Sequence, residues 1–437
     1  MSLQAAPASA GMGAMACLRY GLLGLPLAFV ALPLYLHLPN YYAREYAMPL
    51  GTLGSVLLLA RLFDAITDPW LGRLGDRLHA RSPRRVLGAG GVAALLLLAG
   101  LVLLFFPPWP HAQLPIALLL MLIFTSLAFS FLSITHQSWG ARLGGNELQR
   151  ARIVAWREAA ALLGVVLASV LPSWLGWDQW IAVFALALVA GWLAWSGSPS
   201  PQPLSLAVTS SWREDLIHPW RAAPFRRLLA VFILSGLASA VPATLVLFFI
   251  QDRLQAAAWE PLFLGTYFIA AATAMPLWLR GVARWGLARC WLAGMLLSVM
   301  VFAWAATLGS GDILAFWWVC ALSGLALGAD LALPGALLAG LISERGEQGQ
   351  REGAYFGWWN LAAKLNLALA AGLALPLLEW LGYQPGAANA SGLQALSLAY
   401  AVLPCAIKSL AALGLYLAFV RPLRLSGPAL SKPEESP

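Results

Sequence analysis

Long apolar runs alternate with short polar stretches along the whole chain. Runs of about 20 residues, the length of helix that crosses a hydrocarbon core of about 30 Å, predict twelve membrane-spanning helices. We place them at 21–38, 49–70, 86–106, 114–138, 154–175, 179–196, 228–251, 259–279, 287–308, 313–341, 354–380 and 395–420. The pattern therefore predicts an all-α polytopic membrane protein.

The longest polar interval divides these runs six and six. It predicts an N-terminal six-helix half at 1–197, a central cytoplasmic loop at 198–227, a C-terminal six-helix half at 228–420 and a cytoplasmic tail at 421–437. Two six-helix halves around a central loop are typical of transporters built from structural repeats. An unrelated polytopic protein with an even number of helices would show the same division, so this alternative stays open.

Composition supports a membrane location. Of the 437 residues, 60% are hydrophobic and 11% are charged, whereas a soluble protein carries about 25% charged residues. The basic residues behind the net charge of +8 gather in the polar stretches after even-numbered runs. By the positive-inside rule, those loops and both termini lie in the cytoplasm. The compact loops suit a bacterial inner membrane, and basic residues dispersed over separate loops argue against nucleic-acid binding.

The second apolar run ends in charged residues, Arg61-Leu-Phe-Asp64-Ala-Ile-Thr67-Asp68-Pro69. A charged residue at the centre of a membrane helix costs about 2.5 to 3.5 kcal/mol, so its presence usually indicates function. Asp64 and Asp68 are four residues apart and share one helix face, with Thr67 beside them. Two carboxylates and a hydroxyl suit a monovalent metal cation such as sodium, or one shared proton. The alternative is a structural ion-pair cluster with Arg61 and a distant lysine.

A second motif follows at the predicted turn between the second and third runs. Its pattern, G-x-x-x-D-R, is formed by Gly72, Asp76 and Arg77. It resembles the loop motif of the major facilitator superfamily, in which an acidic residue and arginines latch the cytoplasmic ends of helices. The resemblance implies a conformational latch at these three residues and the fold of that superfamily.

Together the two stretches resemble the glycoside-pentoside-hexuronide:cation symporters, the sodium:melibiose permease group, over nearly the whole chain. ARLFDAITDP matches the cation motif of that family's second helix almost residue for residue. The resemblance implies that Asp64 and Asp68 bind the cation, that Thr67 supports them, and that Ser130 supplies a hydroxyl ligand.

Two later stretches carry the same resemblance. GQREGAYFG at 349–357, followed by Lys364, resembles the family's entry to helix 11 and implies that Lys364 couples the solute and cation sites. Arg157 in RARIVAWRE resembles the family's helix 5 arginine, and the neighbouring Glu158 offers a neutralising charge.

Two positions depart from the family. Ungapped counting puts Ala28 and Ser133 where melibiose permease carries the aspartates that hold sugar hydroxyls. Neither side chain replaces a carboxylate, and losing such hydrogen-bond partners costs affinity and discrimination. The acidic residues that usually follow the tenth helix are also missing near Ser343. These departures weaken the case for galactoside transport, but not for cation coupling.

Asp330 lies in the middle of an apolar stretch, GLALGADLALPGALL, close to Pro334. A helix broken there would aim the Asp330 carboxylate and freed carbonyl groups at a cavity and help to form the solute site. The alternative is an interhelical ion pair with Lys364 or Lys408.

Four other residues are candidates for the solute site. His136 and Gln137, near the end of the fourth run, have side chains that bind polar ligands, with helix capping or a loop-facing position as the alternative. Trp358 and Trp359 lie close to Lys364 in the sequence and are candidates for stacking on a solute. Most other tryptophans lie near run ends, where we expect them to anchor the headgroup layer.

The sequence therefore predicts a secondary active transporter, not an enzyme, that carries a small solute such as a sugar or glycoside by sodium- or proton-coupled symport with alternating access. The expected partners are the solute, the coupling cation and the lipid bilayer, with no cofactor, and the expected state is a monomer. One alternative is a same-fold transporter of an amphipathic lipid or lysolipid. Others are a non-transporting sensor and a membrane-embedded enzyme, which would need a large extramembrane loop that the sequence does not offer.

Overall fold

The computed structural model describes residues 12–32, 34, 38–171, 175–201, 212–383 and 389–421. Within these ranges the regular elements are helical, and no strand occurs among them. Eight helices of the described chain are long and apolar enough to cross a membrane. Of the predicted tail at 421–437, all but the first residue lie outside the described ranges.

The N-terminal half consists of the helices that precede the central loop. They are α1 (Ala14–Gly21), α2 (Gly24–Leu32), α3 (Leu38–Glu45), α4 (Leu50–Arg81), α5 (Pro83–Phe105), the short η2 (His111–Gln113), α6 (Leu114–Arg142), α7 (Glu147–Val170) and α8 (Trp177–Ser196).

The central loop contains one helix, α9 (Trp212–Arg221), and the C-terminal half follows it. The helices of this half are α10 (Ala223–Phe248) with its extension η4 (Phe249–Arg253), η5 (Ala257–Trp259), α11 (Glu260–Trp285), α12 (Leu287–Ala305), α13 (Ile313–Glu344), α14 (Glu352–Trp380), and a last span made of α15 (Ala390–Ser397), η6 (Leu398–Val402), α16 (Leu403–Leu415) and η7 (Tyr416–Val420).

Every predicted apolar run has a helical counterpart, but several boundaries differ from the predicted ones, among them those of the first two runs. The first run comprises the separate helices α1 and α2, and it begins at Ala14. The second run does not end at residue 70, because α4 continues to Arg81. The chain breaks only at Ser82, whose side chain accepts a hydrogen bond from the Arg84 N–H and caps α5, with Pro83 in the first turn. The stretch from 72 to 77, predicted as a turn, is therefore helical.

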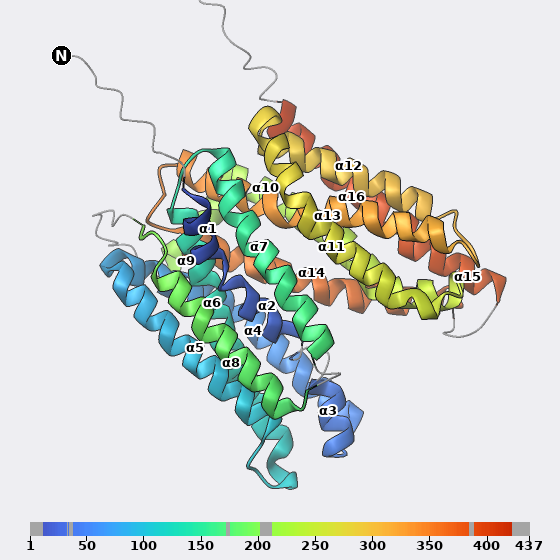
Figure 1. The fold of residues 1–437 in the computed structure, drawn as a ribbon, viewed down its shortest axis with the longest axis horizontal. Helices are drawn as coiled ribbons and strands as arrows, with labels where there is room; N and C mark the ends of the chain where they lie inside the picture. Colours follow the sequence, from blue (N-terminus) through green and yellow to red (C-terminus); the bar gives the residue numbers. More distant parts are fainter. Residues whose placement is uncertain are drawn as a thin grey trace, which may run out of the picture.

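The two halves pack together at one end and diverge toward the other (Figure 1). Helix α4 packs on α14, and α7 packs on α11 and α13. The backbones of α4 and α14 touch at Gly72 and Gly353, where a Cβ on either residue would collide with the carbonyl oxygen of the other. We call the end with this contact the latch end; α9 lies there as well.

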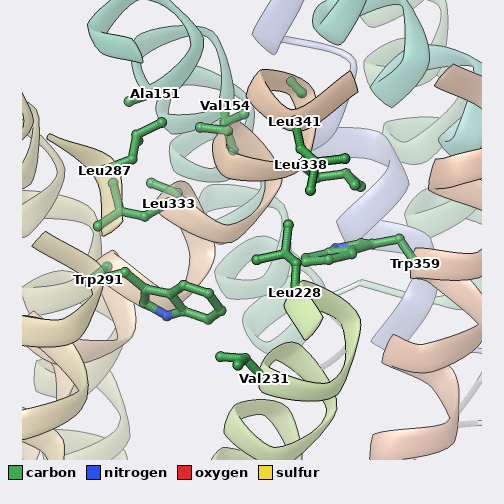
Figure 2. Close-up of a cluster of buried hydrophobic side chains, with 14 of the residues drawn as sticks. Ala151, Val154, Leu228, Val231, Leu287, Trp291, Leu333, Leu338, Leu341 and Trp359 are labelled. Carbon is green, nitrogen blue, oxygen red and sulfur yellow. The ribbon is translucent and has the colours of Figure 1, made fainter. Parts of the chain in front are cut away.

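An apolar cluster joins the halves near the latch end. Figure 2 shows part of it, with side chains from α7, α10, α12, α13 and α14. Ala151 and Val154 come from the N-terminal half, whereas Leu228, Leu338 and Trp359 belong to the C-terminal half. Because lipid tails are as apolar as leucine, such a cluster stabilises the helix contact by close packing.

Candidate cation and solute sites

Four predicted residues from three helices meet in a cluster that we call the cation cluster: Asp64, Asp68, Ser130 and Lys364. The Lys364 Nζ lies 2.8 Å from Asp64 Oδ2, 2.8 Å from the Asp68 carboxylate and 2.8 Å from Ser130 Oγ. Ser130 in turn donates to Asp64 Oδ1 at 2.8 Å. Both carboxylates and the serine are buried. An ammonium group thus occupies the centre of an oxygen-lined site.

The cation cluster spans the boundary between the halves. Asp64 and Asp68 lie one turn apart on α4, as their spacing predicts, and Ser130 comes from α6. Lys364 reaches them from α14 of the other half. With both carboxylates ionised, these groups carry a formal charge of −1, which one further monovalent cation or proton would neutralise.

Thr67 is directed at its own helix rather than at the cation cluster. Its hydroxyl donates to the Asp64 carbonyl oxygen at 3.0 Å, a bond within α4. The structure therefore does not place this hydroxyl among the groups around Lys364, although the residue stands beside them in sequence.

The predicted helix 5 arginine, Arg157, is paired with its neighbour. Its Nε and Nη2 donate to Glu158 Oε1 at 3.0 and 2.5 Å. Beside this pair, His136 Nε2 lies 2.8 Å from the Tyr20 carbonyl oxygen, and the Tyr20 hydroxyl donates to the His136 carbonyl oxygen at 3.1 Å. His136 is fully buried, so neither a capping nor a loop-facing position applies.

Gln137 is part of a second bridge between the halves. Its amide and that of Asn360 exchange two hydrogen bonds, at 3.3 and 3.0 Å, which link α6 to α14. Gln137 also donates to Ser133 at 3.1 Å. The loop-facing alternative for Gln137 was wrong because α6 continues to Arg142. Asn360 was missed, although it stands four residues before Lys364 and therefore on the same helix face.

At the latch end, the side chain of Asp76 on α4 contacts the first turn of α14. Its carboxylate accepts the N–H groups of Gly353 and Ala354 at 2.7 and 2.9 Å. Arg142 of α6 donates to Asp76 at 2.6 Å and pairs with Glu352 at 3.0 Å. These groups form the latch network. A carboxylate against the first N–H groups of a helix also gains from the helix dipole.

Only part of the latch network was predicted. Gly72 allows the close contact with α14, and Asp76 provides the central carboxylate, as the motif indicates. Arg142, which bonds to Asp76, was not predicted; Arg77, the arginine of the motif, is half-buried on α4. Arg142 follows the fourth run, and nothing in its local sequence distinguishes it from other loop arginines.

A smaller cluster connects α9 to the loop before α14. Glu347 accepts hydrogen bonds from Arg345 Nε and the Tyr355 hydroxyl, each at 2.9 Å, and lies 3.0 Å from His218 Nε2. Burial alone would raise the pKa of Glu347. The hydrogen bonds from His218 and Tyr355, with the charge of Arg345, outweigh burial and lower that pKa below its ordinary value of 4.5.

Comparisons with known proteins agree with this architecture. The family model described as MFS/sugar transport protein matches residues 12–420. The chain belongs to this family. Inner membrane symporter YicJ of Escherichia coli (strain K12) is 25% identical over 263 residues, 55% of this chain and 56% of that protein. Glucuronide carrier protein homolog of the same strain is 30% identical over 132 residues, 30% of this chain and 29% of that protein. The chain thus aligns with about half or less of these relatives.

A solved structure shows the same fold. A bacterial homologue of the iron transporter ferroportin, in the outward-facing state with soaked iron, superposes with a TM-score of 0.70 at 16% identity, over 93% of this chain and 99% of that one. The predicted family and its all-α membrane fold are therefore confirmed for this chain.

The two tryptophans that are candidates for stacking on a solute contact protein groups in this structure. Trp358 Nε1 donates to the Leu216 carbonyl oxygen of α9 at 2.9 Å. Trp359 is buried and stacks on Phe232, with ring centroids 3.8 Å apart. Both rings therefore pack between elements of the protein in this structure.

Asp330 forms an ion pair with Lys408 of α16, one of the two lysines considered as partners. Trp291 Nε1 donates to the same carboxylate at 2.8 Å, and Ser235 and Ser239 donate to it at 3.3 and 3.4 Å. The predicted break in the helix was wrong, since α13 runs through Pro334 without interruption. Asp330 is therefore held by side chains from α10, α12 and α16.

Proposed function

We propose that this MFS/sugar transport protein is a symporter of a bacterial inner membrane that couples the movement of sodium or a proton to that of a sugar-like solute. One observation carries the proposal: the Lys364 ammonium sits among two buried carboxylates and a hydroxyl, at 2.8 Å from each of the three side chains. A site that holds the ammonium group of a lysine side chain is suited to exchange it for a free monovalent cation. The name of one relative, a symporter, supports symport, and the family description, MFS/sugar transport protein, supports the solute class.

Orientation follows from the positive-inside rule. The basic loops predicted to be cytoplasmic include the one after α4 and the one that contains α9, and both belong to the latch end. The latch end is then cytoplasmic, both termini are cytoplasmic, and the conformation described here is closed to the cytoplasm. Asp76 and Arg142 hold this closed state.

Competition between cations provides the coupling. In this conformation Lys364 bridges the halves through Asp64 and Asp68. An entering cation would take the place of the ammonium, remove that bridge and release a positive charge into the path between the halves. A buried charge without a partner is costly, so the released ammonium favours separation of the halves at this contact. Binding of the cation and of the solute then favours the exchange between outward-facing and inward-facing states. All these groups belong to one chain, which suits a monomer.

The experiment that tests the proposal is calorimetry of sodium binding to the purified protein at pH 6 and pH 8, with Asp64→Asn as the comparison. The expected result is saturable heat at pH 8 that is lost in Asp64→Asn. Proton release without sodium heat would assign the coupling to protons. The absence of both sodium heat and proton release would overturn cation coupling at this cluster. That result would favour the uncoupled carrier of a lipid or lysolipid.

A further inference from the structure

The C-terminal half contains a cavity of about 140 Å³ that takes no part in the cation cluster. Its walls come from α10, α11, α12, α13 and η6. On α13 it extends from Cys320 to Asp330, a distance of about 15 Å along the helix axis. Asp330 stands near the middle of α13, so it lies at the floor of the cavity, and Cys320 lies toward the end opposite the latch. We call this space the C-terminal cavity.

The size and lining of the cavity point to a small ring-shaped ligand. A protein cavity of about 150 Å³ holds a single benzene ring, so there is room for one six-membered ring. Aromatic side chains of Tyr267, Phe268, Phe302 and Tyr400 line the walls. Such faces pack against the apolar side of a ring, while a few placed polar groups fix its orientation.

Polar groups that face the cavity are available to a ligand. Among the described residues, the hydroxyls of Tyr267, Tyr400 and Ser298 have no protein hydrogen-bond partner, and all three residues line the cavity. Tyr400 is only 4% exposed. A hydroxyl that opens onto a cavity and has no protein partner is available to a bound molecule with hydroxyl groups.

Charge decides the class of ligand. Asp330 faces the cavity, whereas Lys408 pairs with it from behind and is not part of the lining. The pair carries no net charge. A cationic ligand would leave one uncompensated positive charge in a low-dielectric site, and an anionic ligand would face the carboxylate; both are costly. A neutral hydroxyl can donate to Asp330 in place of the long bonds from Ser235 and Ser239.

We propose that the C-terminal cavity binds a neutral, single-ring polyol, with Asp330, Tyr267 and Tyr400 as its polar contacts. This inference rests on the proposed transport of a sugar-like solute and assigns the solute to the C-terminal half. It thereby places that ligand away from Ala28 and Ser133, the N-terminal positions that lack carboxylates.

The test is equilibrium dialysis of purified protein with radiolabelled probes in sodium-free buffer. D-Xylose, D-glucose and myo-inositol are the neutral probes; D-glucosamine and D-glucuronate are charged probes of similar size. We expect saturable binding of a neutral probe that Tyr400→Phe weakens about 3- to 10-fold, the effect of one hydrogen bond. Ala243→Leu, which fills the cavity from an exposed position, should abolish it.

Two matched variants serve as controls. Ala230→Leu adds the same volume at an exposed position of α10 outside the cavity, and Tyr42→Phe removes a buried hydroxyl in the N-terminal half. Both should bind like the wild type. No neutral binding, preference for a charged probe, or neutral binding that Ala243→Leu leaves intact would each overturn the inference. Sodium calorimetry of the wild type separates the two proposals: if sodium heat is absent there but neutral binding persists, coupling fails and the solute site stands.

Discussion

The Lys364 ammonium lies 2.8 Å from the Asp68 carboxylate, although 296 positions separate the two residues in the chain. The pair connects α14 of one half to α4 of the other, close to the point where Gly357 packs on the Asp68 backbone. A Cβ on Gly357 would lie 2.7 Å from the Asp68 carbonyl oxygen. The close backbone approach and the ion pair therefore depend on one another. A change at the cation cluster alters the packing of α4 on α14 at the contact between the halves.

Removal of the tethered ammonium should make the protein dependent on free cations. In Lys364→Met, two buried carboxylates lose their counter-charge, and breaking a buried pair in this way costs about 3 to 5 kcal/mol. We expect a lower unfolding temperature in choline chloride and a larger rise on exchange to sodium chloride than in the wild type. Thermal unfolding in detergent at matched ionic strength measures this. Lys408→Met, which breaks the separate Asp330 pair, is the control and should show no enlarged sodium response.

Neutralising one carboxylate should remove the cation response of transport. Asp68→Asn keeps the side-chain volume but leaves one charged ligand, and a hydrogen-bonded charged contact is worth about 1.5 to 3 kcal/mol. The measurement is uptake of the sugar-like solute into proteoliposomes, driven by a sodium gradient. We expect the apparent affinity for the cation to fall at least about 10-fold. Asp312→Asn, in the loop before α13, should behave like the wild type. Wild-type cation dependence in Asp68→Asn would show that Asp68 is not a ligand.

The sequence is most informative where one helix alone determines the outcome. Runs of apolar residues predict helices because a membrane helix must satisfy its own backbone, and the high cost of charge in lipid identifies Asp64 and Asp68. The extension of α4 to Arg81 was missed because hydropathy falls at the end of the apolar core, whereas helical hydrogen bonding continues to Ser82.

Partners across helices could not be derived in the same way. Lys364 was assigned to the cation site by family resemblance, and the choice between Lys364 and Lys408 for Asp330 stayed open until the packing of α13 and α16 was known. Arg142 and Asn360 were missed because each acts through a residue on another helix. Side chains of this kind are identified by tertiary structure, since their local sequence is compatible with several partners.

The glycine contact at the latch end should control the conformational equilibrium. In Gly72→Ala, the added methyl group would collide with the Gly353 carbonyl oxygen, so α4 and α14 must move apart. We expect a larger population of molecules open at the latch end, with about a tenfold shift for each 1.4 kcal/mol of strain. Spin labels at Ala80→Cys on α4 and Glu344→Cys on α13 report the separation by pulsed electron resonance.

Helix α4 provides the matched control for this substitution. A Cβ on Gly54 of the same helix meets no atom within 4 Å among the described residues. Gly54→Ala should therefore leave the distance distribution unchanged. The same distribution in Gly72→Ala and the wild type would mean that this contact does not hold the latch end closed.

The Glu347 cluster should make the contact between α9 and the C-terminal half sensitive to acid. The pKa of Glu347 is below 4.5 in the folded protein, so folding stabilises the ionised carboxylate. This contribution to stability is fully present above pH 4.5 and is lost as the pH falls through the folded pKa. Glu347→Gln should thus lower the unfolding temperature at pH 7, and the difference from wild type should shrink as the pH falls below about 4.5. Glu344→Gln, at an exposed position, should show little difference at either pH. A wild-type advantage that stays constant from pH 7 to pH 4 would show that packing, and not the charge of Glu347, holds α9 in place.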